Sequence, residues 1–267
     1  MNDGLRPLDH YFVGWDVGGW NCDRNPRSRD ALVILNAEGV LLGSVWRGNL
    51  AATIIQSATT GDLIESLFRL CGCDLPHDPA RVTLAIDAPL GFPAALTRLA
   101  SRREHTSFLS QESEANPYLF RECERYLFAR GFKPLSAIKD MIGSQTTKAM
   151  HVLARFAPKI ERCGVWTDGQ MLSVIETYPA PCRHSPTMSA ILDQYRLTER
   201  DEQPRRATAS SIGHDDKRDA LICALVARLF MTDSSTLMPP TNSIPPEEGW
   251  IWLPCDALQP QRISPSR

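Results

Sequence analysis

Acidic side chains stand at the ends of several apolar runs in this chain, where they could bind a divalent cation. Asp16, Asp87 and Glu176 each close such a run at its C-terminal end. If these runs are parallel strands, their carboxyl ends share one edge of a sheet, which is where open α/β sheets bind ligands. Carboxylates that meet there repel one another unless a cation is bound, and their oxygens suit Mg²⁺ or Mn²⁺. The sequence therefore predicts a divalent-metal site at that edge.

Two further acids open a helical segment near the C-terminus. Asp216 and Asp219 are three residues apart, so a helix places them on one face. The residues that follow, Ala220–Val226, are nearly all apolar, so we expect a buried helix whose buried stripe begins at Asp219. Each acid also has an ordinary interpretation, because aspartates often form turns after strands or cap helices. Their joint occurrence favours a shared site that includes Asp216 and Asp219.

The elements that must position these acids predict an α/β fold. The expected strands are Tyr11–Asp16, Ala31–Leu35, Val40–Trp46, Arg81–Ile86 and Met171–Glu176. The expected helices begin at Thr60 or cover Tyr118–Arg130, Thr146–Ala157 and Asp216–Met231. Antiparallel strands followed by a helical crossover and a parallel strand indicate a mixed five-stranded sheet flanked by helices.

The domain organisation follows from the same patterns. We expect a single domain over residues 1–233, with a largely helical insertion at about 94–169. Residues 234–267 are rich in proline and are expected to form a C-terminal extension, in which Gly249–Leu253 could be an edge strand. The polar stretch 198–213 is expected to be a mobile loop.

Composition narrows the class of protein. The chain has 267 residues, 43% of them hydrophobic, with 31 acidic and 29 basic residues and a net charge of −2. These values exclude wholesale disorder and binding of polyanions through bulk charge, so a nucleic-acid partner requires a local basic patch. The eight cysteines are too few for a disulfide scaffold, and the longest apolar stretch falls short of the roughly 20 residues of a membrane span. We expect a cytoplasmic protein without a membrane partner; the oligomeric state is left open.

Five motifs carry a family resemblance, and they extend over residues 11 to about 231. The motifs are Gly14–Trp20, Ile86–Pro93, Arg121–Glu124, Ile175–Pro179 and Asp215–Leu221. The specific parts are Ile-Asp-Ala-Pro-Leu-Gly-Phe-Pro and the late Asp-Asp-x-x-Asp-Ala. The order of elements and acids resembles the ribonuclease H-like superfamily and, more narrowly, the domain of unknown function 429 family, a group of predicted nucleases.

The resemblance implies a ribonuclease H-like fold and phosphodiester hydrolysis by two divalent ions. Asp16 would bridge both ions, Asp87 would ligate one, and Asp219 with Asp216 or Glu176 would hold the other. The nucleic-acid partner could be DNA or RNA. The candidates for cations that meet phosphate are Arg121, Arg125, Lys139 and Lys148, together with a basic stripe of Arg98, Arg102 and Arg103 that could follow a backbone.

Two other functions remain open. Gly14–Gly19 resembles the first phosphate loop of ATP-dependent phosphotransferases and ATPases of the actin and sugar-kinase type, in which backbone N–H groups cradle phosphate. That architecture also needs a second Asp-Gly phosphate loop, whereas Asp87 is followed by Ala88-Pro89. A non-catalytic binding module of the ribonuclease H-like type would keep the acids without affinity for ions.

Overall fold

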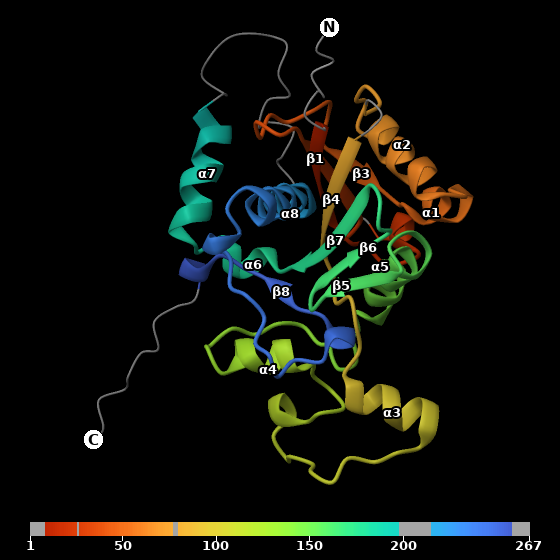
Figure 1. The fold of residues 1–267 in the computed structure, drawn as a ribbon, viewed down its shortest axis with the longest axis vertical. Helices are drawn as coiled ribbons and strands as arrows, with labels where there is room; N and C mark the ends of the chain where they lie inside the picture. The colour runs from red at the N-terminus through yellow and green to blue at the C-terminus, as the bar shows by residue number, and fades with distance from the viewer. Residues whose placement is uncertain (1–8, 26, 77–79, 198–214, 258–267) are drawn as a thin grey trace, which may run out of the picture.

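One mixed sheet forms the centre of the molecule (Figure 1). The computed structural model describes residues 9–25, 27–76, 80–197 and 215–257. The eight strands within these ranges are β1 Asp9–Asp16, β2 Asp30–Leu35, β3 Trp46–Gly48, β4 Ala80–Asp87, β5 Lys159–Arg162, β6 Val165–Thr167, β7 Leu172–Thr177 and β8 Ile251–Trp252. Their order is β3-β2-β1-β4-β7-β6-β5, and β8 also pairs with β7. Strands β1, β4 and β7 run parallel, so their carboxyl ends lie at one edge.

The mixed α/β architecture is confirmed, but the expected count of five strands is wrong. The sheet gains the hairpin of β5 and β6, in which every residue of β5 is exposed. A polar, exposed strand has no apolar alternation, which is why the sequence did not indicate it. The expected strand Val40–Trp46 is largely a turn region in which Leu41 makes one isolated bridge and β3 begins only at its last residue.

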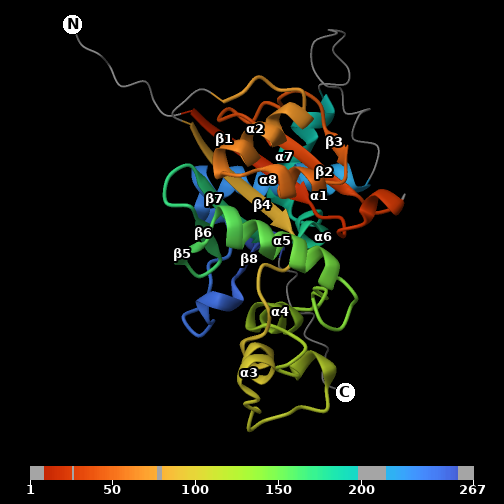
Figure 2. The ribbon, with the colours of Figure 1, turned by 90° about the vertical axis from the view of Figure 1, so that its right-hand side faces the viewer.

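Helices cover both faces of the sheet (Figures 1 and 2). They are α1 Ala51–Gln56, α2 Thr60–Leu70, α3 Ala94–Arg102, α4 Glu122–Phe128, α5 Gly143–Phe156, α6 Pro179–Cys182, α7 Pro186–Leu197 and α8 Asp215–Thr232. Helices α1, α2 and α5 lie on one face, and α7 and α8 lie on the other. Because both faces are covered, β2 is buried along its whole length. In the described part of the chain, no helix combines the length and apolar composition that a membrane span requires.

Two segments complete the architecture. Helices α3 and α4 lie beyond the carboxyl edge of the sheet, where α3 projects from the rest of the molecule (Figures 1 and 2). The C-terminal segment returns to the sheet through β8 and buries Trp250 and Leu253 in the same apolar cluster as α8. This segment therefore contributes side chains to the main core. The loop expected at 198–213 lies outside the described residues.

Helix α8 lies directly on β1, and this contact depends on a glycine. A Cβ atom at Gly14 would lie 1.9 Å from the carbonyl oxygen of Ala220 and 2.3 Å from the backbone nitrogen of Ala224. Only a residue without a side chain allows the helix backbone to approach a strand so closely. The contact places the first turn of α8, with its aspartates, over the end of β1.

We predict that Gly14→Ala lowers the free energy of unfolding by about 1–3 kcal/mol or more, because the added methyl group must displace backbone atoms of α8. Urea unfolding measures this decrease. The matched control is Gly61→Ala in α2, where the nearest atom to an added Cβ is 3.7 Å away and alanine favours the helix. Equal stability of the Gly14 and Gly61 variants would contradict the close approach.

Candidate functional site

Asp16 and Asp87 lie side by side at the carboxyl edge of the sheet. They are register partners at the ends of β1 and β4. Side chains alternate between the two faces of a strand, so Phe12 and Asp16, four residues apart on β1, lie on the same face. Phe12 packs in the apolar cluster under α8, which places the side chain of Asp16 on the α8 face of the sheet. Both carboxylates are partly buried and line a cleft of about 220 Å³. No hydrogen bond from the described residues reaches either carboxylate.

The environment of this pair favours the protonated, neutral form. Burial raises the pKa of Asp16 well above its ordinary value, and the charge of neighbouring Asp87 raises it further. Burial likewise raises the pKa of Asp87, with Asp219 as the next largest cause. Loss of solvation of the charged form is the main cause of both shifts, and repulsion by the charges of neighbouring carboxylates adds to it. A bound cation would remove that repulsion.

Asp219 is the third acid of the site, and an arginine holds it. Its Oδ1 accepts a hydrogen bond from Nη2 of Arg183 at 2.5 Å. Burial raises the pKa of Asp219, whereas the guanidinium of Arg183 lowers it. Arg183 follows α6 directly and is partly exposed; its Nε is buried and has no hydrogen-bond partner within the described residues. Arg183 therefore places a positive charge next to the acids.

Asp216 is bound more completely than Asp219. Its Oδ2 accepts hydrogen bonds from Nε of Arg47 at 2.8 Å and from the backbone N–H of Arg29 at 3.0 Å. Nη2 of Arg47 lies 2.7 Å from the same oxygen. Asp216 thus joins α8 to β3 and to the segment before β2. In this conformation it serves as a structural link.

Glu176 lies one residue short of the acidic pair and on the other side of the sheet. It pairs with Ile86 rather than with Asp87, and residues of its parity on β7, such as Val174, pack under α5. Arg121 binds both of its oxygens, with Nη2–Oε1 at 2.6 Å and Nη1–Oε2 at 2.8 Å. The backbone N–H of Leu90 also donates to Oε2 at 2.8 Å. Glu176 nevertheless lines the same cleft as Asp16 and Asp87. Its charge contributes to the raised pKa of Asp87, while its own carboxylate is bound by Arg121.

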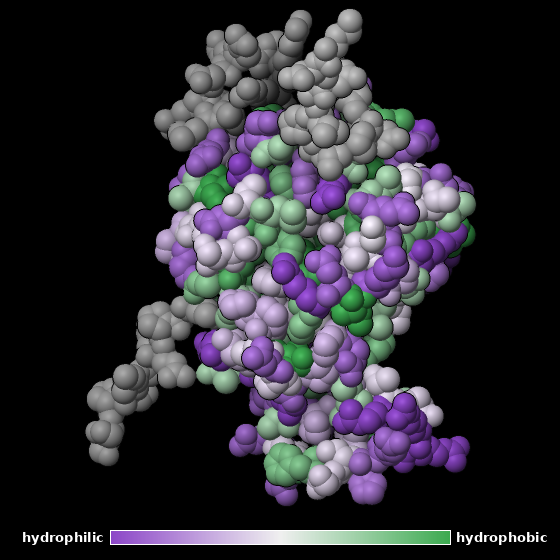
Figure 3. Space-filling view, viewed as in Figure 1, coloured by the Kyte–Doolittle hydropathy of each residue, from purple (hydrophilic) through white to green (hydrophobic). Residues whose placement is uncertain are grey.

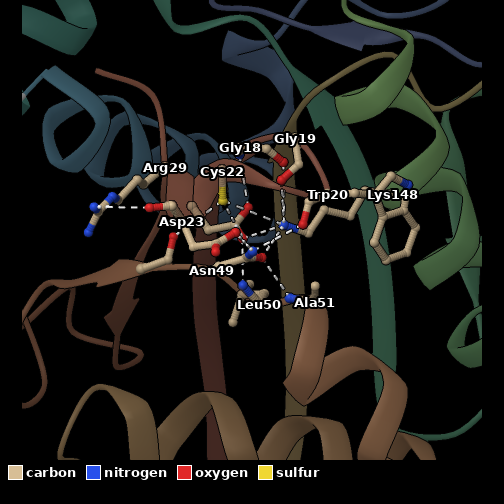
Figure 4. Close-up of polar contacts among 12 residues, drawn as sticks. Gly18, Gly19, Trp20, Cys22, Asp23, Arg29, Asn49, Leu50, Ala51 and Lys148 are labelled. Atoms are coloured by element: carbon tan, nitrogen blue, oxygen red, sulfur yellow. Dashed lines mark hydrogen bonds and ion pairs between the residues drawn. The ribbon is translucent and has the colours of Figure 1, made fainter. Parts of the chain in front are cut away.

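The turn after β1 is fixed by a fully buried ion pair (Figure 4). Nζ of Lys148 lies 2.5 Å from Oδ2 of Asp30 and within 3.4 Å of the carbonyl oxygens of Gly18 and Gly19. Oδ1 of Asp30 accepts from the N–H of Gly18 at 2.9 Å and from Nε1 of Trp15 at 3.0 Å. The turn thus presents carbonyl oxygens to a lysine and commits its Gly18 N–H to an aspartate. This geometry differs from a phosphate loop, whose N–H groups face the ligand.

The cations expected to meet phosphate have different positions. Arg121 and Lys148 are buried in ion pairs, and Arg125 pairs with Glu122, whereas Lys139 is exposed near the ring of Phe120. The sequence reasoning missed Arg47 and Arg183, which bind the aspartates of α8. Neither arginine stands in a motif or at a helical spacing from its partner. No sequence signal therefore identified these two pairs.

The arrangement of the acids suits one hard cation held by two carboxylates better than a metal site in which protein side chains supply every ligand. Within the described ranges, no group of three or more His, Cys, Asp or Glu side chains is arranged to hold a metal ion. Asp16 and Asp87 are nevertheless adjacent anionic donors without hydrogen bonds from the described residues. Mg²⁺ in proteins is commonly held by one or two carboxylates, with water and substrate phosphate as the other ligands. The pair suits that mode of binding.

The fold and site define an α/β protein with an acidic pair at the carboxyl edge of a mixed sheet. A family model described as "Protein of unknown function (DUF429)" matches residues 45–243, and the chain belongs to this family. The match contains Asp87, Glu176, Asp216 and Asp219 and begins after Asp16. No curated protein and no solved structure matches the chain.

We predict that Asp16→Asn stabilises the metal-free protein at neutral pH. The folded-state pKa of Asp16 lies above the value of about 3.9 for an unfolded aspartate, so its stabilising contribution is present below that pH and is lost as the pH rises through the folded pKa. The asparagine variant cannot lose a proton. Its advantage in free energy of unfolding should therefore be absent near pH 3 and grow as the pH rises above about 4.

Urea unfolding in chelator at a series of pH values measures this difference. The control is Glu38→Gln, which removes a carboxylate from an exposed turn. A difference between Asp16→Asn and wild type that stays constant with pH would contradict the raised pKa.

We predict that Arg121→Met lowers the free energy of unfolding by about 3–5 kcal/mol, because it leaves Glu124 and Glu176 buried without their guanidinium. The control, Arg69→Met, removes the exposed pair with Glu65 and should change stability by about 0.5 kcal/mol or less. Adding Glu176→Gln to the Arg121 variant should recover part of the stability. Equal effects of Arg121→Met and Arg69→Met would mean that the buried network contributes little.

Proposed function

We propose that this chain is a divalent-metal-dependent nuclease with a ribonuclease H-like core. The observation that carries the proposal is the pair Asp16 and Asp87, adjacent at the ends of parallel strands and free of hydrogen bonds from the described residues. The core of the sheet supports it, because in the order β3-β2-β1-β4-β7 only β2 runs opposite to the other strands. The family membership agrees with the resemblance but does not itself assign an activity.

Asp16 and Asp87 would hold Mg²⁺ or Mn²⁺, and Asp219 is the next acid available. Such an ion, when bound, lowers the pKa of water and stabilises charge on a phosphate oxygen. A second ion, as two-metal hydrolysis requires, needs Asp219 to exchange Arg183 for the cation. Asp216 and Glu176 keep their arginines and position α8 and β7 around the pair.

Positive charge for the phosphate comes from two places in this proposal. Arg183 lies beside Asp219, and its side chain is partly exposed. Helix α3 and the residue after it carry Arg98, Arg102 and Arg103, all exposed, on the part of the molecule that projects beyond the carboxyl edge. Hydrophilic side chains gather over this part in Figure 3. A polynucleotide that reaches the acids could therefore pass over α3.

The phosphotransferase alternative has less support. Its phosphate loop would be the turn at Gly18 and Gly19, where the Gly18 N–H is bound to Asp30 and the two carbonyl oxygens lie near Lys148. Phosphate would meet oxygens there rather than N–H donors. No observation on the described residues favours this alternative over the nuclease.

We predict Mn²⁺- or Mg²⁺-dependent cleavage of a labelled oligonucleotide by the purified chain, with a decrease of at least about 100-fold in Asp16→Asn and in Asp87→Asn. Changing an outer ligand already lowers metal affinity or activity by about 10–100-fold, and these two residues would contact the ion directly. Gel analysis follows cleavage, and calorimetry measures Mn²⁺ binding.

The matched control is Glu65→Gln on the exposed face of α2, prepared identically, which should retain wild-type cleavage. Cleavage that survives both aspartate substitutions would come from another source and would overturn the proposal. Mn²⁺ binding without cleavage, or no Mn²⁺ binding at all, would favour the non-catalytic module. Stabilisation by ATP but not by Mn²⁺ would favour the phosphotransferase.

A further inference from the structure

The cleft above the acidic pair has mostly apolar walls. Pro134, Leu135, Ile142 and the ring of Tyr178 line it together with the two aspartates. The ion pair of Arg121 and Glu176 also belongs to the lining. Its volume, about 220 Å³, is below the roughly 300–1,000 Å³ of ordinary ligand pockets. A charged sugar-phosphate chain alone would gain little from such walls. A flat, largely apolar group next to the phosphate would gain much more.

Tyr178 supplies an aromatic ring to this wall and is held in position. It follows β7 directly, and its hydroxyl donates a hydrogen bond to the carbonyl oxygen of Lys133 at 3.1 Å. That bond ties β7 to the segment that carries Pro134 and Leu135, so the two sides of the cleft are joined. The bond fixes the orientation of the ring, which packs against the apolar cluster of α8 and also lines the cleft.

The rim of the cleft exposes further apolar side chains. Leu135 and Ile138 are exposed, and Met141 is 92% exposed with a φ of +60°. Positive φ is uncommon for residues other than glycine, and strained backbone of this kind clusters at functional sites. The next residue, Ile142, lines the cleft itself. The exposed apolar surface is therefore continuous with the wall above the acids.

The projecting segment after α3 carries an exposed aromatic ring close in sequence to exposed arginines. Phe108 is 67% exposed, and it follows the exposed Arg98, Arg102 and Arg103 within ten residues. Exposed aromatic rings among basic side chains are typical of surfaces that bind single-stranded nucleic acid, where bases stack on rings and phosphates meet cations. In a duplex the base faces are already stacked on one another, so such rings have nothing to bind.

We infer that the substrate of the proposed nuclease is single-stranded nucleic acid, with one unstacked nucleotide in the cleft against Tyr178 and the flanking strand over Phe108 and the three arginines at α3. This inference rests on the proposed function and assigns its substrate class. The volume of the cleft, about 220 Å³, suits a single base better than a base pair. DNA and RNA share the chemistry that these surfaces recognise, and the experiment compares both.

The test measures binding and cleavage of one labelled oligonucleotide as a single strand and as a blunt duplex, in DNA and RNA form. Binding is followed by fluorescence anisotropy in the Asp87→Asn protein with Mg²⁺, and cleavage in wild type with Mn²⁺. We expect single strands to bind at least tenfold more tightly than duplex in one of the two chemistries. Cleavage should show the same preference.

Two aromatic substitutions locate the strand. Phe108→Ala and Tyr178→Leu should each weaken single-strand binding by at least about fivefold, since each stacked base contributes about 1–3 kcal/mol. Tyr178→Phe keeps the ring and should bind within about twofold of its parent. The control for Phe108 is Ile55→Ala on α1, which is similarly exposed at 64% and lies on a helix covering a face of the sheet.

A triple variant tests the arginines at α3. Replacing Arg98, Arg102 and Arg103 together by alanine should make the affinity for single strands less sensitive to salt. The slope of log affinity against log salt concentration should fall by about 0.7 for each phosphate that these arginines neutralise in the wild type. An unchanged slope would remove α3 from the path of the strand.

The outcomes separate the two proposals. Metal-dependent cleavage of duplex as rapid as that of single strands, or unchanged single-strand binding by Phe108→Ala and Tyr178→Leu, overturns the substrate class and leaves the nuclease standing. No binding or cleavage of any polynucleotide overturns both. Phe108 is a surface residue, so its result stands even if a Tyr178 variant unfolds.

Discussion

The contact between α8 and β1 is the constraint on which the site depends. Gly14 lets the backbone at Ala220 and Ala224 lie against the strand, and that approach brings the first turn of α8 to the carboxyl edge of the sheet. Asp219 immediately precedes Ala220, so its position follows from the same contact. A larger residue at position 14 would separate the helix from the strand and the third aspartate from the acidic pair.

Arginines divide the five predicted acids into two groups. The first group is bound by arginines: Glu176 by Arg121, Asp216 by Arg47 and Asp219 by Arg183. Asp16 and Asp87 are not bound by an arginine of the described residues, and their pKa values rise because burial and the charges of neighbouring carboxylates disfavour ionisation. The fold thus tolerates an unfavourable pair of carboxylates at one place. Such a pair lowers stability unless a cation is bound, which is why it is the centre of the proposed function.

The ion pair of Lys148 and Asp30 fixes the end of β1 from the face of the sheet opposite to α8. Asp30 holds the indole of Trp15 and the N–H of Gly18, which lie on either side of Asp16 in the chain. Lys148 belongs to α5 on the opposite face from α8, so the ion pair links α5 to the end of β1, against which α8 packs from the other side. Removing either charge would leave the other buried without compensation. The position of Asp16 is therefore constrained from both faces of the sheet.

The sequence by itself determined the mixed α/β class, the position of α8 and the acids that end β1 and β4, because buried apolar runs and helical periodicity are local patterns. It could not determine that Glu176 pairs with Ile86 instead of Asp87, since strand register depends on contacts between distant segments. Nor could it show that Arg47 and Arg183 bind the aspartates of α8, or that residues 134–142 contribute to the apolar wall of the cleft. Ion pairs and cleft walls join residues that are far apart in the chain, so only the tertiary structure decided which acids remained without a positively charged partner among the described residues.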